Sequence, residues 1–262
     1  MKSLRIAATG MQAQELNVEV ISNNIANMRT TGFKQVRAEF QDLLYQDVRR
    51  VGANSSASGN IIPTGVQIGY GVKTGATARI MSQGNLQQTD KELDVAIRGE
   101  GFFSVELPSG QTAYTRDGSF ELDANGNLVT LDGFQVQPNI TVPNNARSIT
   151  INRQGTVQVL TGTSTTPTDL GQIQLSRFVN KAGLQSIGDN LYLETPASGT
   201  PIDGVGDEEG FGSLSQKFLE NSNVNAVSEL SDLIAAQRAY EMNAKVISAS
   251  DEMMSTTSNI VR

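Results

Sequence analysis

Residues 4–28 read LRIAATGMQAQELNVEVISNNIANM, and their apolar side chains recur at steps of three and four residues. Such steps are typical of one face of an α-helix, and here they continue for nearly four heptads. One heptad position holds Leu4, Met11, Val18 and Ile25, and the other holds Ala7, Gln14, Ile21 and Met28. We therefore expect a long helix that pairs with another helix and ends near Thr30–Gly32, where a glycine can terminate it.

The C-terminal residues carry a matching pattern. A seven-residue ladder runs through Ala226, Leu233, Tyr240, Ile247, Met254 and Val261, accompanied by Leu230, Gln237, Ala244, Asp251 and Ser258. Such a narrow stripe can cover one partner helix. Because the two stripes lie at opposite ends of the chain, we expect the terminal helices to pair with each other as a coiled coil. The alternative is that both helices pack on an ordinary globular core.

Between the two helical ends, the sequence is typical of antiparallel β-structure. Short apolar runs are separated by turn dipeptides such as Asp117-Gly118, Asn125-Gly126 and Asp132-Gly133. The expected strands are Leu93–Ile97, Phe102–Leu107, Ala113–Thr115, Ser119–Leu122, Leu128–Leu131, Phe134–Gln137, Ser148–Ile151, Thr156–Leu160, Ile173–Phe178 and Leu191–Glu194. The predicted class is therefore α+β, with the paired terminal helices and a central antiparallel β-rich domain.

Two segments that join these parts have compositions typical of loops. Arg49–Gly69 contains a Gly- and Ser-rich run without apolar periodicity, and Pro196–Gly212 is rich in Gly and acidic residues. By composition alone, both joins are flexible linkers. The segment between Gly32 and Tyr45 suits either a short helix or a buried irregular strand.

Composition excludes several functional classes. The 262-residue chain contains no His and no Cys, and its 27 acidic and 20 basic side chains give a net charge of −7. Without these residues there is no Ser-His-Asp relay, disulfide, thiolate nucleophile or zinc knuckle. The acidic total argues against nucleic-acid binding. No apolar run reaches about 18 residues, so we expect no direct membrane insertion.

Two short patterns resemble functional motifs but have simpler explanations. The glycines of Gly69–Gly75 do not have dinucleotide-loop spacing, and Asp123–Asn127 lacks the glycine register of a calcium loop. A carboxylate-pair hydrolase remains open, with Asp94, Asp117, Glu121 and Asp132 as candidates. Asp117 and Asp132 precede glycines in turns, where Asp is common without catalysis. We predict no catalytic residue, cofactor or metal site.

Several longer motifs identify a family resemblance. Ser22–Asn27 (SNNIAN) with Thr31–Lys34 (TGFK), Leu93–Phe103 (LDVAIRGEGFF), Tyr114–Phe120 (YTRDGSF), Gly126–Thr130, Gly133–Val136, Ser222–Asn225 (SNVN), Glu229-Leu230 and Ala236–Glu241 (AQRAYE) follow one another along the chain. This order resembles the bacterial flagellar basal-body rod and hook protein family. The modest length and the stretch after the N-terminal signature are most similar to its distal rod members.

The resemblance implies a division into four parts. Residues 1–31 would form an N-terminal helix in the core of a tube, and residues 32–69 a connecting segment with an extended stiffening stretch at 46–65. Residues 70–212 would form a β-rich outer domain. Residues 213–262 would form a C-terminal connector and the second core helix.

The implied function is that of a structural subunit of the distal rod, which polymerises into a rigid helical tube and transmits torque from motor to hook. Implied partners are further copies of the chain, proximal rod proteins, hook protein, the P and L rings and the type III export apparatus, with the rod in the periplasm. Expected self-assembly residues are Leu4, Met11, Val18, Ile21, Asn24, Ile25, Asn27, Leu230, Leu233, Tyr240, Ile247 and Met254. Alternatives are a proximal rod or hook subunit, a secreted peptidoglycan hydrolase and a coiled-coil adhesin.

Overall fold

A computed structural model describes residues 2–50, 64–162 and 166–260, and the chain forms two compact units. The first unit comprises residues 1–25, 36–78 and 226–262, and the second comprises residues 26–35 and 79–225. Both ends of the chain therefore belong to the first unit, whereas the second unit is built mainly from the middle. Within the described ranges, no helix has the length and apolar character needed to cross a membrane.

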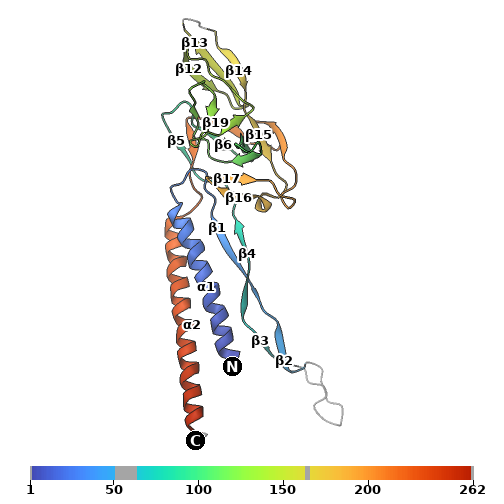
Figure 1. Cartoon of the computed structure of the whole chain (residues 1–262), viewed down its shortest axis with the longest axis vertical. Helices are drawn as coiled ribbons and strands as arrows, with labels where there is room; N and C mark the ends of the chain where they lie inside the picture. The colour runs from blue at the N-terminus through green and yellow to red at the C-terminus, as the bar shows by residue number, and fades with distance from the viewer. Residues whose placement is uncertain (1, 51–63, 163–165, 261–262) are drawn as a thin grey trace. The chain divides into compact units, whose positions relative to one another are not determined.

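The first unit contains the two long helices, α1 (Lys2–Ala26) and α2 (Ala226–Ile260). Figure 1 shows them side by side and antiparallel, with the C-terminal end of α2 reaching beyond the start of α1. α1 ends at Ala26, shortly before the predicted stop. The chain leaves it through a turn in which the Thr30 amide donates to the Asn27 carbonyl, followed by Gly32 at a φ of 70°. Val261, the last residue of the predicted ladder, lies outside the described residues.

A two-stranded ribbon completes the first unit (Figure 1). β1 (Val36–Asp42) pairs with β4 (Val72–Arg79), and β2 (Tyr45–Arg49) pairs with β3 (Val66–Gly69). The two ladders are joined by backbone hydrogen bonds from Leu43 to Gly71 and from Tyr70 to Leu44. The ambiguous segment after Gly32 is thus a strand. Of the predicted stiffening stretch 46–65, residues 51–63 lie outside the described residues.

The second unit is a set of antiparallel sheets. The main sheet has the order β16-β17-β8-β7-β11-β10-β9, with β15 bonded to both β7 and β18; β12-β13-β14, β19-β6 and β20-β5 form smaller sheets. The bounds are β5 (Leu86–Gln88), β6 (Val95–Arg98), β7 (Phe102–Glu106), β8 (Thr112–Thr115), β9 (Glu121–Leu122), β10 (Leu128–Val129), β11 (Gln135–Gln137), β12 (Ala146–Ile151), β13 (Thr156–Thr161), β14 (Thr168–Gln172), β15 (Gln174–Arg177), the 3-10 helix η1 (Lys181–Gly183), β16 (Gln185–Gly188), β17 (Leu191–Leu193), β18 (Ile202–Val205), β19 (Ser213–Gln216) and β20 (Phe218–Glu220). The α+β prediction is confirmed.

Strand β7 is the centre of the second unit because both of its faces are covered. Phe103 and Val105 point into the larger core, where the rings of Phe103 and Phe120 meet edge to face at 5.0 Å. Phe102, one residue earlier, points the other way into a second cluster with Tyr114, Phe178, Leu184 and Tyr192. Because successive side chains of a strand point to opposite faces, this one strand contributes side chains to two apolar clusters.

Two segments differ from their expected flexibility. Val66–Gly69, at the end of the join Arg49–Gly69, form β3 and pair with β2. Within Pro196–Gly212, residues Ile202–Val205 form β18, which pairs in register with all four residues of β15. The Gly-rich and acidic composition weakens strand propensity, but the partner strand supplies the backbone hydrogen bonds. The prediction of a flexible linker was therefore wrong for these residues.

Candidate assembly surface

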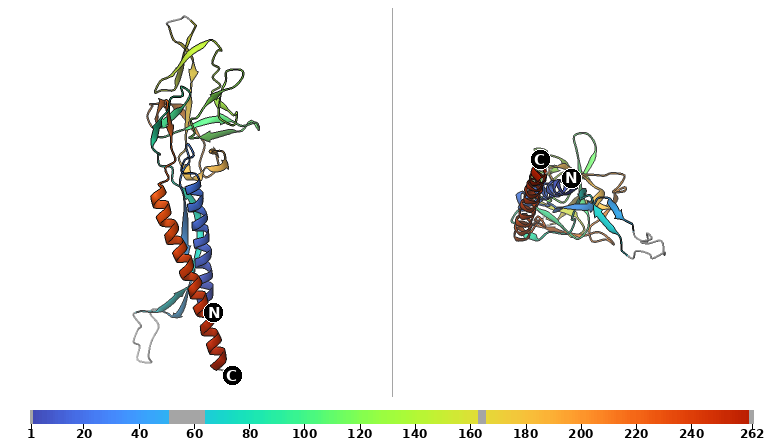
Figure 2. Two further views of the ribbon diagram at one scale, coloured as in Figure 1. Left: turned by 90° about the vertical axis from the view of Figure 1, so that its left-hand side faces the viewer. Right: turned by 90° about the horizontal axis from the view of Figure 1, so that it is seen from below.

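The two long helices contact each other at a constant antiparallel register. Asn24 Nδ2 lies 3.1 Å from Glu229 Oε2, a Cβ built on Gly10 would lie 3.0 Å from Asn243 Nδ2, and Ser3 Oγ lies 3.5 Å from Ser250 Oγ. In each of these pairs the two residue numbers add to 253. α1, which begins at Lys2, therefore faces α2 along its whole length, and the register places residue 251 opposite Lys2. Figure 2 shows α2 continuing past the start of α1.

Close approaches between the helices involve small or polar residues, such as Gly10 opposite Asn243 and Ser3 opposite Ser250. Ala7, Ala13 and Ile21 are buried on α1, and Ala236 is buried on α2. On α2 the buried heptad position runs through Glu229, Ala236 and Ser250 and includes half-buried Asn243. This position lies one residue before the predicted accompanying series that begins at Leu230. It went unpredicted because polar and small residues occupy most of it.

The expected self-assembly residues take three kinds of position. Ile21 and Asn24 are buried. Leu230 and Tyr240 are 51% and 44% exposed, although Tyr240 shares its heptad position with half-buried Leu233 and Ile247. The remaining members are half-buried along the helix contact or its ends, namely Leu4, Met11, Val18, Ile25, Asn27, Leu233, Ile247 and Met254. Their role in contacts between subunits stays a prediction.

A second apolar stripe on α2 is left uncovered by α1. We call it the outer stripe; its members, spaced alternately by four and three residues, are Ala235, Ala239, Met242, Val246, Ala249 and Met253. Met242, Val246 and Met253 are 60%, 47% and 61% exposed. Alternating steps of four and three are the spacing of a coiled-coil seam. α2 thus carries two seams, of which α1 occupies one.

Asn24 connects three elements of the first unit. Its side-chain amide donates to the Val36 carbonyl at 2.8 Å and to Glu229 at 3.1 Å, and its oxygen accepts from the Val36 amide at 2.9 Å. The side chain is 1% exposed. Because α1, the start of β1 and the first turn of α2 meet on one amide, Asn24 fixes where the ribbon leaves the helix pair.

The ribbon packs on the N-terminal half of α1 and exposes apolar side chains. The Val72 amide donates to Thr9 Oγ1 at 3.4 Å, and a Cβ on Gly71, whose φ is 115°, would lie 2.2 Å from that oxygen. Only glycine fits this approach. Further out, the exposed apolar side chains of the ribbon are Leu44, Tyr45, Val48, Val66 and Ile68.

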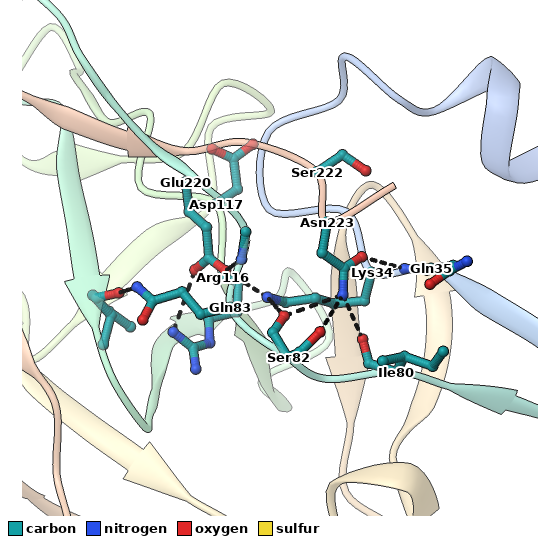
Figure 3. A network of polar contacts seen from close by, with 12 residues as sticks. Lys34, Gln35, Ile80, Ser82, Gln83, Arg116, Asp117, Glu220, Ser222 and Asn223 are labelled. Carbon is teal, nitrogen blue, oxygen red and sulfur yellow. Dashed lines mark hydrogen bonds and ion pairs between the residues drawn. The ribbon is translucent and has the colours of Figure 1, made fainter. Parts of the chain in front are cut away.

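A buried charge cluster ties together the segments that enter and leave the second unit (Figure 3). Lys34 Nζ lies 2.5 Å from one carboxylate oxygen of Glu220, and Arg116 Nη1 lies 3.3 Å from the other. All three side chains are at most 3% exposed. Burial lowers the pKa of Lys34 and of Arg116, and the Glu220 charge opposes the shift in both.

Backbone groups complete this cluster. Lys34 also donates to the Ser82 carbonyl at 2.8 Å, and Arg116 donates to the Gly99 carbonyl at 2.7 Å. Asn223 accepts from the Gln35 amide at 2.7 Å and donates to the Ile80 carbonyl at 2.8 Å (Figure 3). Lys34, Arg116 and Asn223 belong to the motifs that carried the family resemblance, so those motifs hold together the chain segments of the second unit.

Comparison with known proteins gives matches at both ends and in the middle. Residues 4–34 match the family described as "Flagella basal body rod protein", residues 96–159 match "Flagellar hook protein FlgE/F/G D1 domain", and residues 215–260 match "Flagellar basal body rod FlgEFG protein C-terminal". The flagellar basal-body rod protein FlgG of Caulobacter vibrioides is 57% identical over 99% of both chains. The FlgG proteins of Agrobacterium fabrum, with 98% of both chains covered, and Bacillus subtilis, with 100%, are 53% and 39% identical.

The chain belongs to the FlgG family of flagellar basal-body rod proteins. The predicted resemblance to distal rod proteins is confirmed, and with it a structural role in the flagellar rod. The proximal rod, hook and hydrolase alternatives are not favoured. A solved structure, the Helicobacter pylori hook protein FlgE2, matches 71% of this chain and 43% of its own length at 15% identity, with a TM-score of 0.25 that is too low to bear on the fold.

The carboxylates considered for hydrolysis have structural surroundings in this FlgG-family chain. Asp117 accepts the Ser119 amide and hydroxyl at 3.0 and 2.7 Å, and Glu121 forms an exposed ion pair with Lys91. Asp117 and Asp132 line one small cleft of about 160 Å³, which Asp94 and Glu121 do not reach. In the described ranges, no group of three or more acidic residues could hold a metal ion.

Proposed function

We propose that this chain polymerises into a rigid helical tube, the distal rod, which transmits torque from the flagellar motor to the hook. The observation that carries the proposal is the outer stripe of α2. An apolar heptad seam on a helix whose opposite seam is already occupied requires another helix. The occupant is a second copy of this chain, because a subunit that polymerises presents the same helices to every neighbour.

The dimensions of the helix pair also suit the core of a tube. α2 has 35 residues against 25 in α1, so its last turns have no partner in the described part of the chain. Those turns include Met253, at the end of the outer stripe. In a polymer, this overhang would pair with helices of the next subunit along the tube, giving axial as well as lateral contacts.

The ribbon supplies a second type of contact between subunits. Val66 and Ile68 alternate with Gln67 on β3, so they share one face, and both are exposed. An isolated two-stranded ribbon is marginally stable in water and gains stability when its apolar face is covered. We assign this face to a neighbouring subunit, where it would limit bending of the tube and make the rod stiff.

The remaining functional assignments follow from this role. The chain is not an enzyme, and it holds no cofactor. Its partners are copies of itself, the proximal rod and hook proteins at its two ends, the P and L rings around it and the type III export apparatus that delivers it. The assembled rod lies in the periplasm.

A paired set of variants tests the proposal. Met242→Glu with Val246→Glu places two charges on the outer stripe, whereas Gln237→Glu with Ser248→Glu adds the same charges to exposed polar positions of α2. Each pair replaces the native gene in a flagellated host, and swarming and isolated basal bodies are examined. We expect loss of rods and swarming only with the outer-stripe pair, while circular dichroism shows retained folding. Normal rods in that pair, or equal loss in both pairs, would overturn the proposal.

A further inference from the structure

The main sheet of the second unit carries a polar cleft on the face opposite its larger core. Phe103, Val105 and Leu175 point into that core, so the alternating residues Ser104 and Ser176 point the other way. Strand register then places Ser104 beside Tyr114 and Ser176 beside Asp203. The resulting cleft has a volume of about 540 Å³ and is also lined by Gln174 and Glu194.

A chain of hydroxyl groups that ends on a carboxylate supports the floor of the cleft, with Ser104 and Asp203 in the lining and buried Ser176 linking them. Ser176 donates to Asp203 Oδ1 at 2.5 Å, and the Ser104 and Ser176 hydroxyl oxygens lie 2.8 Å apart. Because the Ser176 proton is directed to Asp203, Ser104 must be the donor to Ser176. Both serines are buried, so these hydroxyls form a rigid network that holds the Asp203 carboxylate at the cleft.

Tyr114 forms one wall and brings an unused hydroxyl. The residue is 4% exposed, and its ring packs edge to face on Phe178 at 4.8 Å. Among the described residues, its hydroxyl makes no hydrogen bond, and it is not one of the buried side-chain atoms that lack a partner, so the oxygen is open to the cleft that Tyr114 lines. Burial, followed by the charges of Glu194 and Asp203, raises the pKa of Tyr114 to about 12. The hydroxyl shares the lining of one cleft with both carboxylates and stays protonated at neutral pH.

The chemistry of the lining selects the charge of a ligand. Two carboxylates line the cleft, and none of the described lining residues is basic. An anion would be repelled. A neutral sugar commonly stacks on an open aromatic face, but the ring of Tyr114, the one aromatic residue in the lining, is packed inside the aromatic cluster. Carboxylate, amide and phenol oxygens together match a ligand that donates several N–H bonds.

We propose that this cleft binds an organic cation, a primary ammonium or guanidinium group, between Glu194, Asp203 and the Tyr114 hydroxyl. The cation is either a Lys or Arg side chain of a second copy or a free amine. The site goes beyond the assembly role of the helices and ribbon, and none of its residues belongs to them. It would remain intact if the outer stripe of α2 proved to have another function.

Binding can be measured on the full-length, unpolymerised chain. The probes are 1,5-diaminopentane and methylguanidine, with the neutral tetramer of N-acetylglucosamine for comparison, and the readout is the amide NMR shifts of β7, β8, β15 and β18. Glu194→Gln with Asp203→Asn removes both charges. Asp132→Asn with Glu209→Gln removes two exposed carboxylates elsewhere in the unit and serves as the matched control.

We expect saturable shifts with both cations, weakened at least tenfold in the cleft pair and unchanged in the control pair. Tyr114→Phe, which removes only a hydroxyl, should weaken binding without disturbing the fold. Absence of saturable binding, equal weakening in the control pair, or preference for the saccharide would overturn the proposal. In assembled rods, carbodiimide coupling of Glu194 or Asp203 to a Lys of a second copy identifies the subunit source. Amine binding to rods without such coupling identifies a free amine.

Discussion

The side chain of Asn24 donates a hydrogen bond of 3.1 Å to the carboxylate of Glu229, across 205 positions of sequence. The same amide is paired in both directions with the backbone of Val36, the first residue of β1. One buried side chain therefore sets the register of α1 against α2 and the point where the ribbon departs.

Replacing Asn24 should loosen the first unit. Asn24→Ala leaves the backbone groups of Val36 and the carboxylate of Glu229 without this partner in a buried site, which costs about 2–4 kcal/mol. Hydrogen exchange of the α1 and α2 amides in the unpolymerised chain measures the effect. Gln12→Ala, at an exposed position of α1, should change exchange by less than about 0.5 kcal/mol. Equal exchange in the two variants would contradict the role of Asn24.

Removing Glu220 should destabilise the second unit more than removing Lys34. Glu220→Gln leaves two buried cations without a counter-charge, and breaking a buried pair in this way costs about 3–5 kcal/mol. Lys34→Met retains the Arg116–Glu220 pair and replaces the buried ammonium by an apolar group of similar length, so its cost should be smaller. Urea unfolding followed by exchange of the β7 amides gives both values. A larger loss in Lys34→Met would show that the cluster does not depend on its carboxylate.

The pH dependence of stability should also report the burial of Lys34. Burial lowers its pKa in the folded chain below the ordinary value of 10.5. Between the lowered value and 10.5 the unfolded chain binds more protons, so stability must rise with pH in that window. The free energy of unfolding of the native chain, relative to Lys34→Met, should therefore increase up to pH 10.5 and then level off. A difference that is constant with pH, or that falls, would contradict the shift.

Sequence patterns predicted the regular parts of this fold and missed those set by distant partners. All ten expected strand runs contain observed strands, because alternating apolar residues bounded by Gly turns carry a local signal. The sequence of β18 lacks this alternation of apolar residues, and the strand forms by pairing with β15. Lys34 and Glu220 are 186 positions apart, and no local period connects them. The outer stripe was missed because half of it is Ala, whose apolar contribution is small.

Tyr114 should ionise well above an ordinary tyrosine. Burial and the charges of Glu194 and Asp203 raise its pKa from 10.0 to about 12, so the folded chain retains this proton while the unfolded chain loses it. Stability should therefore fall as pH rises from 10 to 12. In a pH titration followed by phenolate absorbance, the native chain should show a phase with its midpoint at a pH of about 12. The Tyr114→Phe variant should lack this phase. Tyr240→Phe, at an exposed position, should retain that phase; its loss in both variants would contradict the assignment.

The two seams of α2 should fail in different ways when charged. Ile247 lies half-buried on the side that faces α1, so Ile247→Asp places a charge inside the helix pair of a single subunit. Met242 and Val246 lie on the outer stripe, so charges there leave the pair intact and oppose only the next copy. Both changes should abolish rods while the β-rich unit stays folded. Exchange of α1 amides in the unpolymerised chain should accelerate in Ile247→Asp and stay native in the outer-stripe pair. Acceleration in both would mean that α1 reaches the outer stripe, and normal motility in Ile247→Asp would show that the helix pair is dispensable for assembly.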